Sequence, residues 1–343
     1  MSEVPGTLDT AGAVRRGVRS GLFTLGAMTL AMWVAHASGI DAGAVERLTA
    51  TARPGRLFGA WALLMSGTVL MAFRWRALMP VRDHVRILPL ATFLVSGTLL
   101  NHALPGPVGE FFAAAMAGRR YGMTAETALA ANAYGRLVGL AMAGVVAGVL
   151  FLAADMPVPA TVRTWVGAVT ACILVVAIGV AVLATRPSLL RRVSGATLGR
   201  FHVLAPLHTR VLGLVESLAV VGTLPRGRWL EACAWSLLGH TSAIVGTGMA
   251  AEALGGSPDP AGLAFTYTVT TAGAVLLFAF PGTQVGWEAM LTTLLVATAG
   301  LSLPVALGVA LVIRTQQIAT VLLGAVVLPQ TARREEDHGA RGG

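Results

Sequence analysis

The chain has 343 residues, of which 55% are hydrophobic and only 12% are charged, and its mean hydropathy is +0.73. Soluble domains carry about 25% charged residues, so this composition excludes a soluble globular protein and indicates a membrane protein with several spans. The net charge is +9, and all 25 basic residues are arginine. Because the arginines flank apolar segments, we expect them to set the membrane topology and to meet anionic lipid, and we expect no nucleic-acid partner.

Six apolar stretches are long enough to cross a bilayer, which takes roughly 20 residues. They follow a mostly polar segment, residues 1–18, which we expect to be cytoplasmic. Together with the stretches between them they form a membrane domain that we expect to occupy residues 19–328. The predicted crossing helices are 20–40, 57–79, 124–154, 161–184, 228–252 and 303–328.

Two further apolar stretches, 87–118 and 261–301, are interrupted by a proline-glycine motif. Residues 105–110 read Pro-Gly-Pro-Val-Gly-Glu, and residues 281–288 read Pro-Gly-Thr-Gln-Val-Gly-Trp-Glu. Proline removes a backbone donor and clashes with the preceding turn, so neither stretch forms one straight helix. We therefore expect two re-entrant or broken helical hairpins, each of which enters and leaves on the same side of the membrane.

The segment between the two halves, residues 186–226, is too polar to cross the bilayer, with arginines among leucine and valine. We expect one or two helices that lie along the cytoplasmic surface, and a plain solvated linker is the alternative. Residues 329–343 are rich in charge, which indicates a disordered cytoplasmic tail.

The placement of arginine orients these elements. With both termini in the cytoplasm, nineteen arginines, Arg74 among them, are cytoplasmic and four are outside, which leaves Arg136 and Arg314 in the membrane. The bias agrees with the positive-inside rule. The first hairpin then opens to the cytoplasm and the second to the outside, so repeat one (about 57–154) and repeat two (about 228–328) are inverted. The predicted fold is an all-α polytopic membrane protein with six crossing helices plus two re-entrant hairpins in an inverted repeat.

Each half carries one glutamate and one arginine in apolar sequence. Arg136 follows Glu110 by 26 residues, and Arg314 follows Glu288 by 26 residues. Charged side chains are costly in a bilayer, so these four are the leading candidates for a substrate site. Arginine suits phosphate because its planar fork donates two parallel hydrogen bonds. Two alternatives stay open: the glutamates are only helix caps, or the pairs are only structural salt bridges.

Four other residues support this predicted site. Gly109 and Gly286 precede the two glutamates and would let an anionic ligand approach the backbone at a helix N-terminus. Asn101 lies just before the first turn, and Asn132 lies one helical turn before Arg136. The asparagines either line a hydrated groove or make ordinary hydrogen bonds between helices.

The remaining signals are structural. Gly135 and Gly139 have near-helical spacing, which favours close helix packing. Cys172 and Cys233 show no spacing typical of a metal or redox pair. The sequence contains no Ser-His-Asp set, metal-ligand cluster, phosphate-binding loop or dinucleotide fingerprint. We therefore expect no enzymatic activity, no metal and no cofactor.

The motifs resemble the transmembrane, flippase-like region of lysylphosphatidylglycerol synthases and their stand-alone relatives. The resemblance covers about residues 20–328. Some members of that family carry a soluble aminoacyl-transfer domain, and we expect this chain to be a stand-alone member without it. The residues that carry the resemblance are Asn101, Leu104-Pro105, Gly109-Glu110, Arg136-Leu137, Pro281-Gly282, Gly286, Glu288 and Arg314.

The resemblance implies a lipid translocator. The leading hypothesis is a flippase-like transporter in the plasma membrane that moves an anionic phospholipid or a lipid-linked intermediate between leaflets by alternating access. One alternative is a membrane scaffold that regulates a lipid synthase or glycosyltransferase, which would make a membrane enzyme its partner. Another is a small-anion or proton-coupled solute carrier. The expected partner is membrane phospholipid, and a homo-oligomer is left open.

Overall fold

The computed structural model describes residues 50–103, 108–153, 205–277 and 283–341, with isolated positions between 43 and 46 and between 161 and 179. These residues form helices and contain no β-strand. A single 3-10 turn, Arg82–His84, follows the first long helix. The α-helices are α3 (Pro54–Leu78), α4 (Ile87–Ala103), α5 (Val108–Tyr121), α6 (Ala125–Ala153), α9 (Ala205–Gly222), α10 (Arg226–Ala253), α11 (Pro260–Leu277), α12 (Thr283–Ala299) and α13 (Leu303–Arg341).

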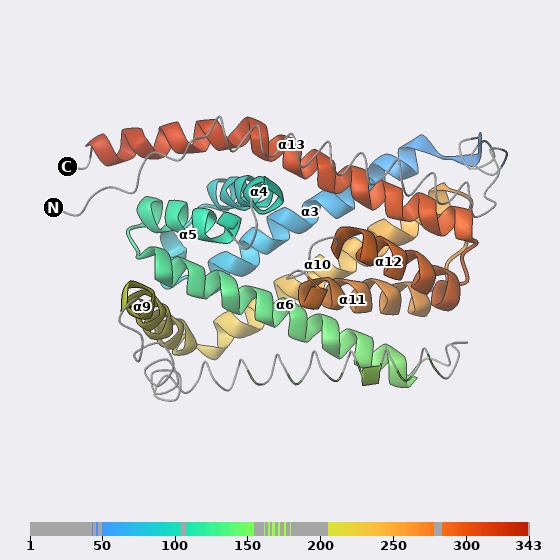
Figure 1. Cartoon of the computed structure of the whole chain (residues 1–343), viewed down its shortest axis with the longest axis horizontal. Coiled ribbons are helices and arrows are strands. Elements are labelled where there is room, and N and C mark those ends of the chain that lie inside the picture. The colour runs from blue at the N-terminus through green and yellow to red at the C-terminus, as the bar shows by residue number, and fades with distance from the viewer. Residues whose placement is uncertain are drawn as a thin grey trace.

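Helices α3 and α10 form an antiparallel pair along the long axis of the molecule (Figure 1). At one end the Arg53 N–H donates to the Ala253 carbonyl at 2.9 Å. At the other end Arg228 Nε donates to the Ala77 carbonyl at 2.7 Å. The start of each helix therefore lies beside the end of the other, and the halves α3–α6 and α10–α13 run in opposite directions.

Each half contains one helical hairpin, as the proline-glycine motifs predict. In the first, α4 packs against α5, and in the second, α11 packs against α12. Figure 1 places these hairpins toward opposite ends of the molecule. Both arms approach closely at glycine: a Cβ at Gly97 would lie 2.6 Å from the Gly109 carbonyl oxygen, and one at Gly262 would collide with the Thr298 carbonyl. The turns themselves, 104–107 and 278–282, lie outside the described residues.

The returning arm of each hairpin ends in the same way. Gly122 follows α5 with a φ of 67°, and Gly300 follows α12 with a φ of 68°. This left-handed conformation favours glycine and ends a helix cleanly. Helix α6 then begins after Thr124, whose Oγ1 accepts the Thr127 N–H at 3.1 Å. Short connections of this kind set the last helix of each half directly beside its hairpin.

The last helix of each half also packs against the hairpin of the other half. Near the end of α6, Phe151 stacks on Phe265 of α11 with ring centroids 6.2 Å apart. On α13, Gly324 lies against α4, where an added Cβ would be 2.7 Å from the Val95 carbonyl oxygen. The two halves are therefore interlocked through α6 and α13.

Three helices are long and apolar enough to cross a membrane: α3, α6 and the Leu303–Pro329 part of α13. At most a third of the most apolar window of each is buried inside the protein, so much apolar surface faces outward, as lipid contact requires. Helix α10 is long enough to cross but has a more polar composition. The expected crossings at 20–40 and 161–184 fall outside the described residues, apart from isolated positions in the second. The protein is an all-α, multi-pass membrane protein.

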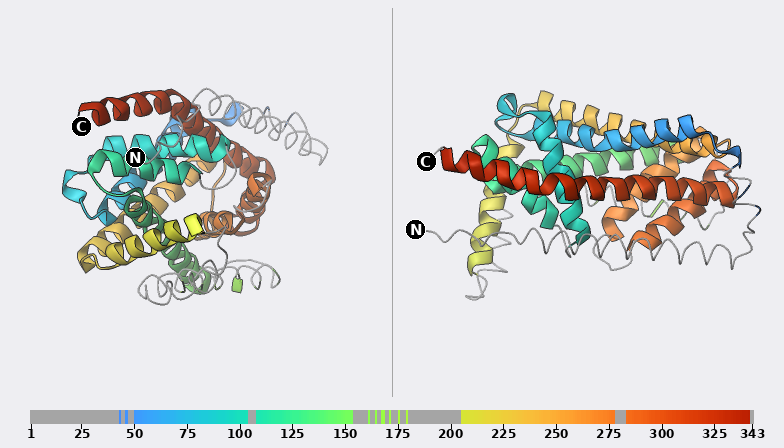
Figure 2. Two further views of the ribbon diagram at one scale, coloured as in Figure 1. Left: turned by 60° about the vertical axis from the view of Figure 1, so that its left-hand side comes forward. Right: turned by 90° about the horizontal axis from the view of Figure 1, so that it is seen from above.

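Two connecting regions complete the fold. Helix α9 lies within the segment that we expected to follow the membrane surface, and Figure 2 (right) shows it running across the direction of α13. The tail differs from the expectation of disorder at 329–343, because α13 continues as helix through Pro329 to Arg341. Alanine, arginine and glutamate dominate this stretch, and all three favour helix.

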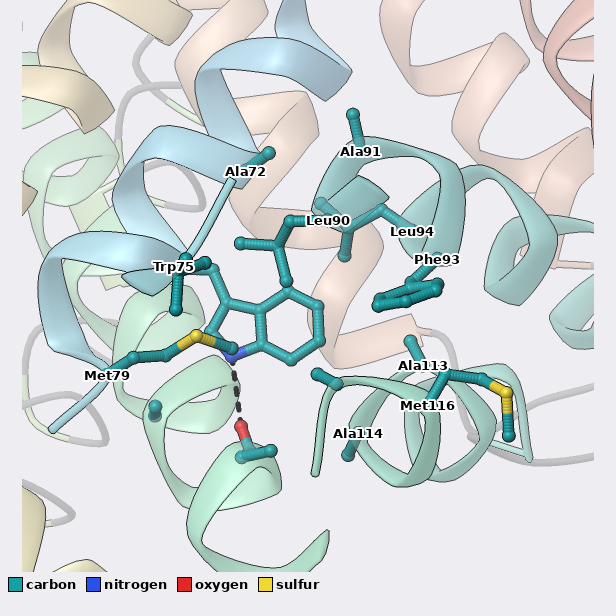
Figure 3. Packing of buried hydrophobic residues seen from close by; sticks show 14 of the residues in the cluster. Ala72, Trp75, Met79, Leu90, Ala91, Phe93, Leu94, Ala113, Ala114 and Met116 are labelled. Atoms are coloured by element: carbon teal, nitrogen blue, oxygen red, sulfur yellow. Dashed lines mark hydrogen bonds between the residues drawn. The ribbon is translucent and has the colours of Figure 1, made fainter. Parts of the chain in front are cut away.

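Trp75 is the centre of the core in the first half. Its side chain is fully buried among apolar residues of α3, α4 and α5 (Figure 3). The indole N–H donates to the Ala128 carbonyl of α6 at 2.9 Å. Because this bond joins α3 to α6 at one defined point, it fixes the rotation of α3 against α6.

We expect Gly262→Ala to destabilise the protein, because the new Cβ collides with the backbone of α12. Overpacking of this kind costs about 1–3 kcal/mol. The matched control is Gly67→Ala in α3, where nothing lies within 4 Å of the added Cβ. That change should be neutral or stabilise by up to about 1 kcal/mol. Thermal unfolding of the purified protein in detergent measures both, and equal midpoints would contradict the close packing of the second hairpin.

Candidate functional site

The first half brings all its predicted site residues together around one carboxylate. Glu110 lies in the first turn of α5, and its Oε1 accepts from Arg136 Nη2 of α6. Its Oε2 accepts from Asn132 Nδ2 at 2.5 Å. Asn101 Nδ2 at the end of α4 donates to Oε1 at 3.1 Å, and its Oδ1 accepts the Gly109 N–H at 2.7 Å. Asn101 thus joins the two arms of the hairpin, and Glu110 accepts from three side chains, one on α4 and two on α6.

The second half repeats the ion pair with different support. Arg314 Nε donates to Glu288 Oε1 at 2.7 Å, and Arg314 Nη1 donates to Gln317 Oε1 at 2.8 Å. Gly286 lies two residues before Glu288, in the first turn of α12. Arg136 and Arg314 are each the twelfth residue of their helix, counted from Ala125 and from Leu303. In α6 this is roughly 17 Å from the helix start, well inside a bilayer core.

The two arginines differ sharply in exposure. The Arg136 side chain is 50% exposed, and its partner Glu110 is 13% exposed. The Arg314 side chain is only 4% exposed, and Glu288 is 20% exposed. The first pair therefore presents a cation at the edge of the helix bundle, whereas the second pair is enclosed by protein.

The four charged residues form two pairs, one per half, rather than one cluster. The halves nevertheless meet near them, because α13, which carries Arg314, packs against both α4 and α5. His102, next to Asn101, lies within electrostatic range of Arg314. The end of α4 thus approaches the charged pair of the second half.

A small pocket adjoins the first pair. It is lined by Thr68 and Met71 of α3, by Thr98 of α4, and by Glu110 and Arg136. Its volume is about 40 Å³, which holds about three water molecules. A phosphate group therefore needs a displacement of Arg136 to enter. Among the described residues, no three His, Cys, Asp or Glu side chains gather as a metal site would require.

Arg74 lies against α6 near this site, although the sequence indicated a place on the cytoplasmic side. Its guanidinium lies on α6, where a Cβ at Gly135 would be 3.4 Å from Nε and a Cβ at Gly139 would collide with Nη1. It is attracted by Glu110 and repelled by Arg136. Gly135 and Gly139 therefore make room for a cation as well as for a neighbouring helix. The spacing of these glycines was the one signal in the sequence that could have located it.

The fold and the site define a multi-pass membrane protein in which each of two inverted halves carries a glutamate on a broken hairpin, paired with an arginine on the helix that follows it. The chain belongs to the family of the lysylphosphatidylglycerol synthase TM region, whose sequence model matches residues 20–324. That family is a membrane domain associated with lipid handling. No match was found among curated proteins or among solved structures.

We expect the two ion pairs to contribute unequally to stability. Arg314→Gln leaves Glu288 without its cation in a buried site, which costs about 3–5 kcal/mol. Arg136→Gln should cost about 1 kcal/mol or less, because Glu110 keeps Asn101 and Asn132 and the arginine is half exposed. Thermal unfolding in detergent compares the two variants.

The double variant Glu288→Gln with Arg314→Gln is the control for the unpaired charge. It should recover part of the loss, since it leaves no unpaired carboxylate. A loss for Arg136→Gln as large as that for Arg314→Gln would show that exposure does not distinguish the two pairs.

Proposed function

We propose that the protein is a flippase-like transporter of the plasma membrane that moves an anionic phospholipid, or a lipid-linked intermediate bearing phosphate, between leaflets. The observation that carries the proposal is the half-exposed Arg136 in the middle of an apolar helix, paired with Glu110 at the start of α5, the returning arm of a broken hairpin. Intramembrane arginine is costly in lipid, and its guanidinium fork matches the oxygens of phosphate.

The contacts of Glu110 support an ion pair that opens. When Arg136 turns toward a phosphate, Glu110 still accepts from Asn101 and Asn132. The carboxylate is therefore not left without donors, which lowers the cost of releasing the arginine. In this mechanism the head group follows a polar path beside the pair while the acyl chains stay in lipid.

The inverted halves support alternating access. Two oppositely oriented repeats that rock against each other would expose the site first to one leaflet and then to the other. The enclosed Glu288–Arg314 pair would open in the opposite phase and contact the phosphate on the second side. We propose that both termini are cytoplasmic, as the arginine distribution indicates. The transporter in this proposal catalyses no covalent chemistry and needs no cofactor.

Translocation is measured with fluorescent phosphatidylglycerol in liposomes, where a reductant that cannot cross the membrane reports the lipid reaching the outer leaflet. Wild-type protein should accelerate this step, and Arg136→Ala should slow it about tenfold or more, because a charge-assisted contact is worth about 1.5–3 kcal/mol. Arg314→Ala should slow it similarly, assayed at a temperature where the variant is folded. The control is Arg56→Ala, which removes an exposed pair with Glu252 at the start of α3.

Unchanged translocation in both Arg136→Ala and Arg314→Ala would overturn the mechanism. If pure liposomes show no lipid movement but an enzyme is recovered with the protein, the scaffold is the better account. Uptake of a soluble anion with no lipid movement favours the solute carrier.

A further inference from the structure

Arg74 is a cation inside the first half that forms no ion pair or hydrogen bond with any described residue. Its guanidinium lies against α6 at Gly135 and Gly139, and Glu110 is the carboxylate that attracts it. Glu110 is already engaged by Arg136, Asn132 and Asn101. By contrast, Arg56 and Arg82 elsewhere in the first half each hydrogen-bond a carboxylate.

The first half therefore carries more positive than negative charge at its site. Two arginines, Arg74 and Arg136, share one carboxylate, whereas in the second half one arginine, Arg314, faces one carboxylate, Glu288. A partly buried cation that shares one carboxylate with a second arginine is incompletely compensated, which is costly. An anion that enters beside Arg136 would complete the charge balance.

We propose that Arg74 and Arg136 together bind the phosphate of one anionic lipid head group, with Arg74 as the stationary half of the clamp. The inference rests on the proposed function and names its substrate class. Arg136 is half exposed and swings toward the incoming group, while Arg74 is held against α6. The backbone at Arg74 is held in place because the adjacent Trp75 side chain is buried and donates a hydrogen bond to the Ala128 carbonyl.

The surroundings favour a lipid phosphodiester over a free anion. Phe111, the neighbour of Glu110, is 55% exposed. An exposed aromatic side chain next to the Glu110–Arg136 pair matches a head group with attached acyl chains. The excess of one positive charge selects a head group with a net negative charge over a zwitterionic one, whose own cation would be repelled.

The glycines of α6 supply a second way to test Arg74. Because a Cβ at Gly135 would lie 3.4 Å from Arg74 Nε, Gly135→Asp brings a carboxylate to the unpaired guanidinium. That variant keeps Arg74 but neutralises its charge with a neighbouring carboxylate. Arg74→Gln instead removes the charged group. The only change common to the two variants is that the Arg74 charge is no longer available to a ligand.

The experiment is calorimetric titration of the purified full chain with dihexanoyl phosphatidylglycerol. Wild type and the control Arg56→Gln should bind equally. Arg74→Gln and Gly135→Asp should bind about tenfold more weakly or worse, since each loses one charge-assisted contact. Dihexanoyl phosphatidylcholine and inorganic phosphate should both bind wild type much more weakly than phosphatidylglycerol does.

Thermal unfolding without lipid separates binding from a structural role. A ligand-binding cation that lacks a partner destabilises the empty protein, so Arg74→Gln should unfold at the same or a higher temperature than wild type. A structural arginine would instead lower that temperature when removed. A lowered unfolding midpoint, or unchanged lipid affinity in Arg74→Gln, overturns the clamp.

The same samples are assayed for translocation in liposomes, which keeps the two proposals separate. Phosphatidylglycerol binding that depends on Arg74, with no lipid movement by wild type, would overturn the flippase and leave the phosphate site standing. Lipid movement that is unaffected in both Arg74→Gln and Gly135→Asp would overturn the clamp and leave the flippase. Inorganic phosphate that binds as tightly as the lipid would overturn the lipid as the source of the phosphate.

Discussion

Each half of this protein is organised around the need to balance an arginine charge within apolar helices. Arg136 lies about 17 Å along α6, too deep for bulk water to solvate it well, and a glutamate must reach the same depth. A straight helix through the first hairpin would not begin there. Because the chain breaks between α4 and α5, Glu110 lies in the first turn of α5, beside the arginine. The broken hairpin and the ion pair therefore explain each other.

The glutamate–arginine pair occurs in both halves, but its hydrogen-bond partners and its exposure differ between them. Around Glu110 two asparagines share the carboxylate with Arg136, so the arginine is one donor among three. Around Arg314 the additional hydrogen bond is made by the cation and not by the carboxylate, because Arg314 donates to Gln317. This pair is also enclosed by protein. A carboxylate with spare donors can release its arginine, whereas an enclosed pair resists separation. In this structure the first pair is partly exposed and has additional donors, whereas the second pair is enclosed by protein.

Much of this was readable from the sequence because charge in apolar sequence is rare and expensive. The proline-glycine breaks and the two pairs followed from that rule, whereas for Asn101 and Asn132 the sequence left open a hydrated groove or hydrogen bonds between helices. The position of Arg74 did not follow from that rule. Because Arg74 lies near the end of α3 close to other arginines, we interpreted it as one of the cytoplasmic arginines that set the membrane topology. Its true position depends on the rotation of α3, which the Trp75 bond to Ala128 fixes and which no local pattern encodes. The helical tail beyond Pro329 was missed because charge suggested disorder more strongly than helix propensity opposed it.

Helices α6 and α13 each pack against the hairpin of the opposite half. Helix α6 carries Arg136 at its centre and rests with its far end on α11, while α13 carries Arg314 and rests on α4. Each charged helix is thus seated on the opposite repeat. In the proposed transport cycle, a tilt of either hairpin would therefore also displace the helix that carries the arginine of the other half.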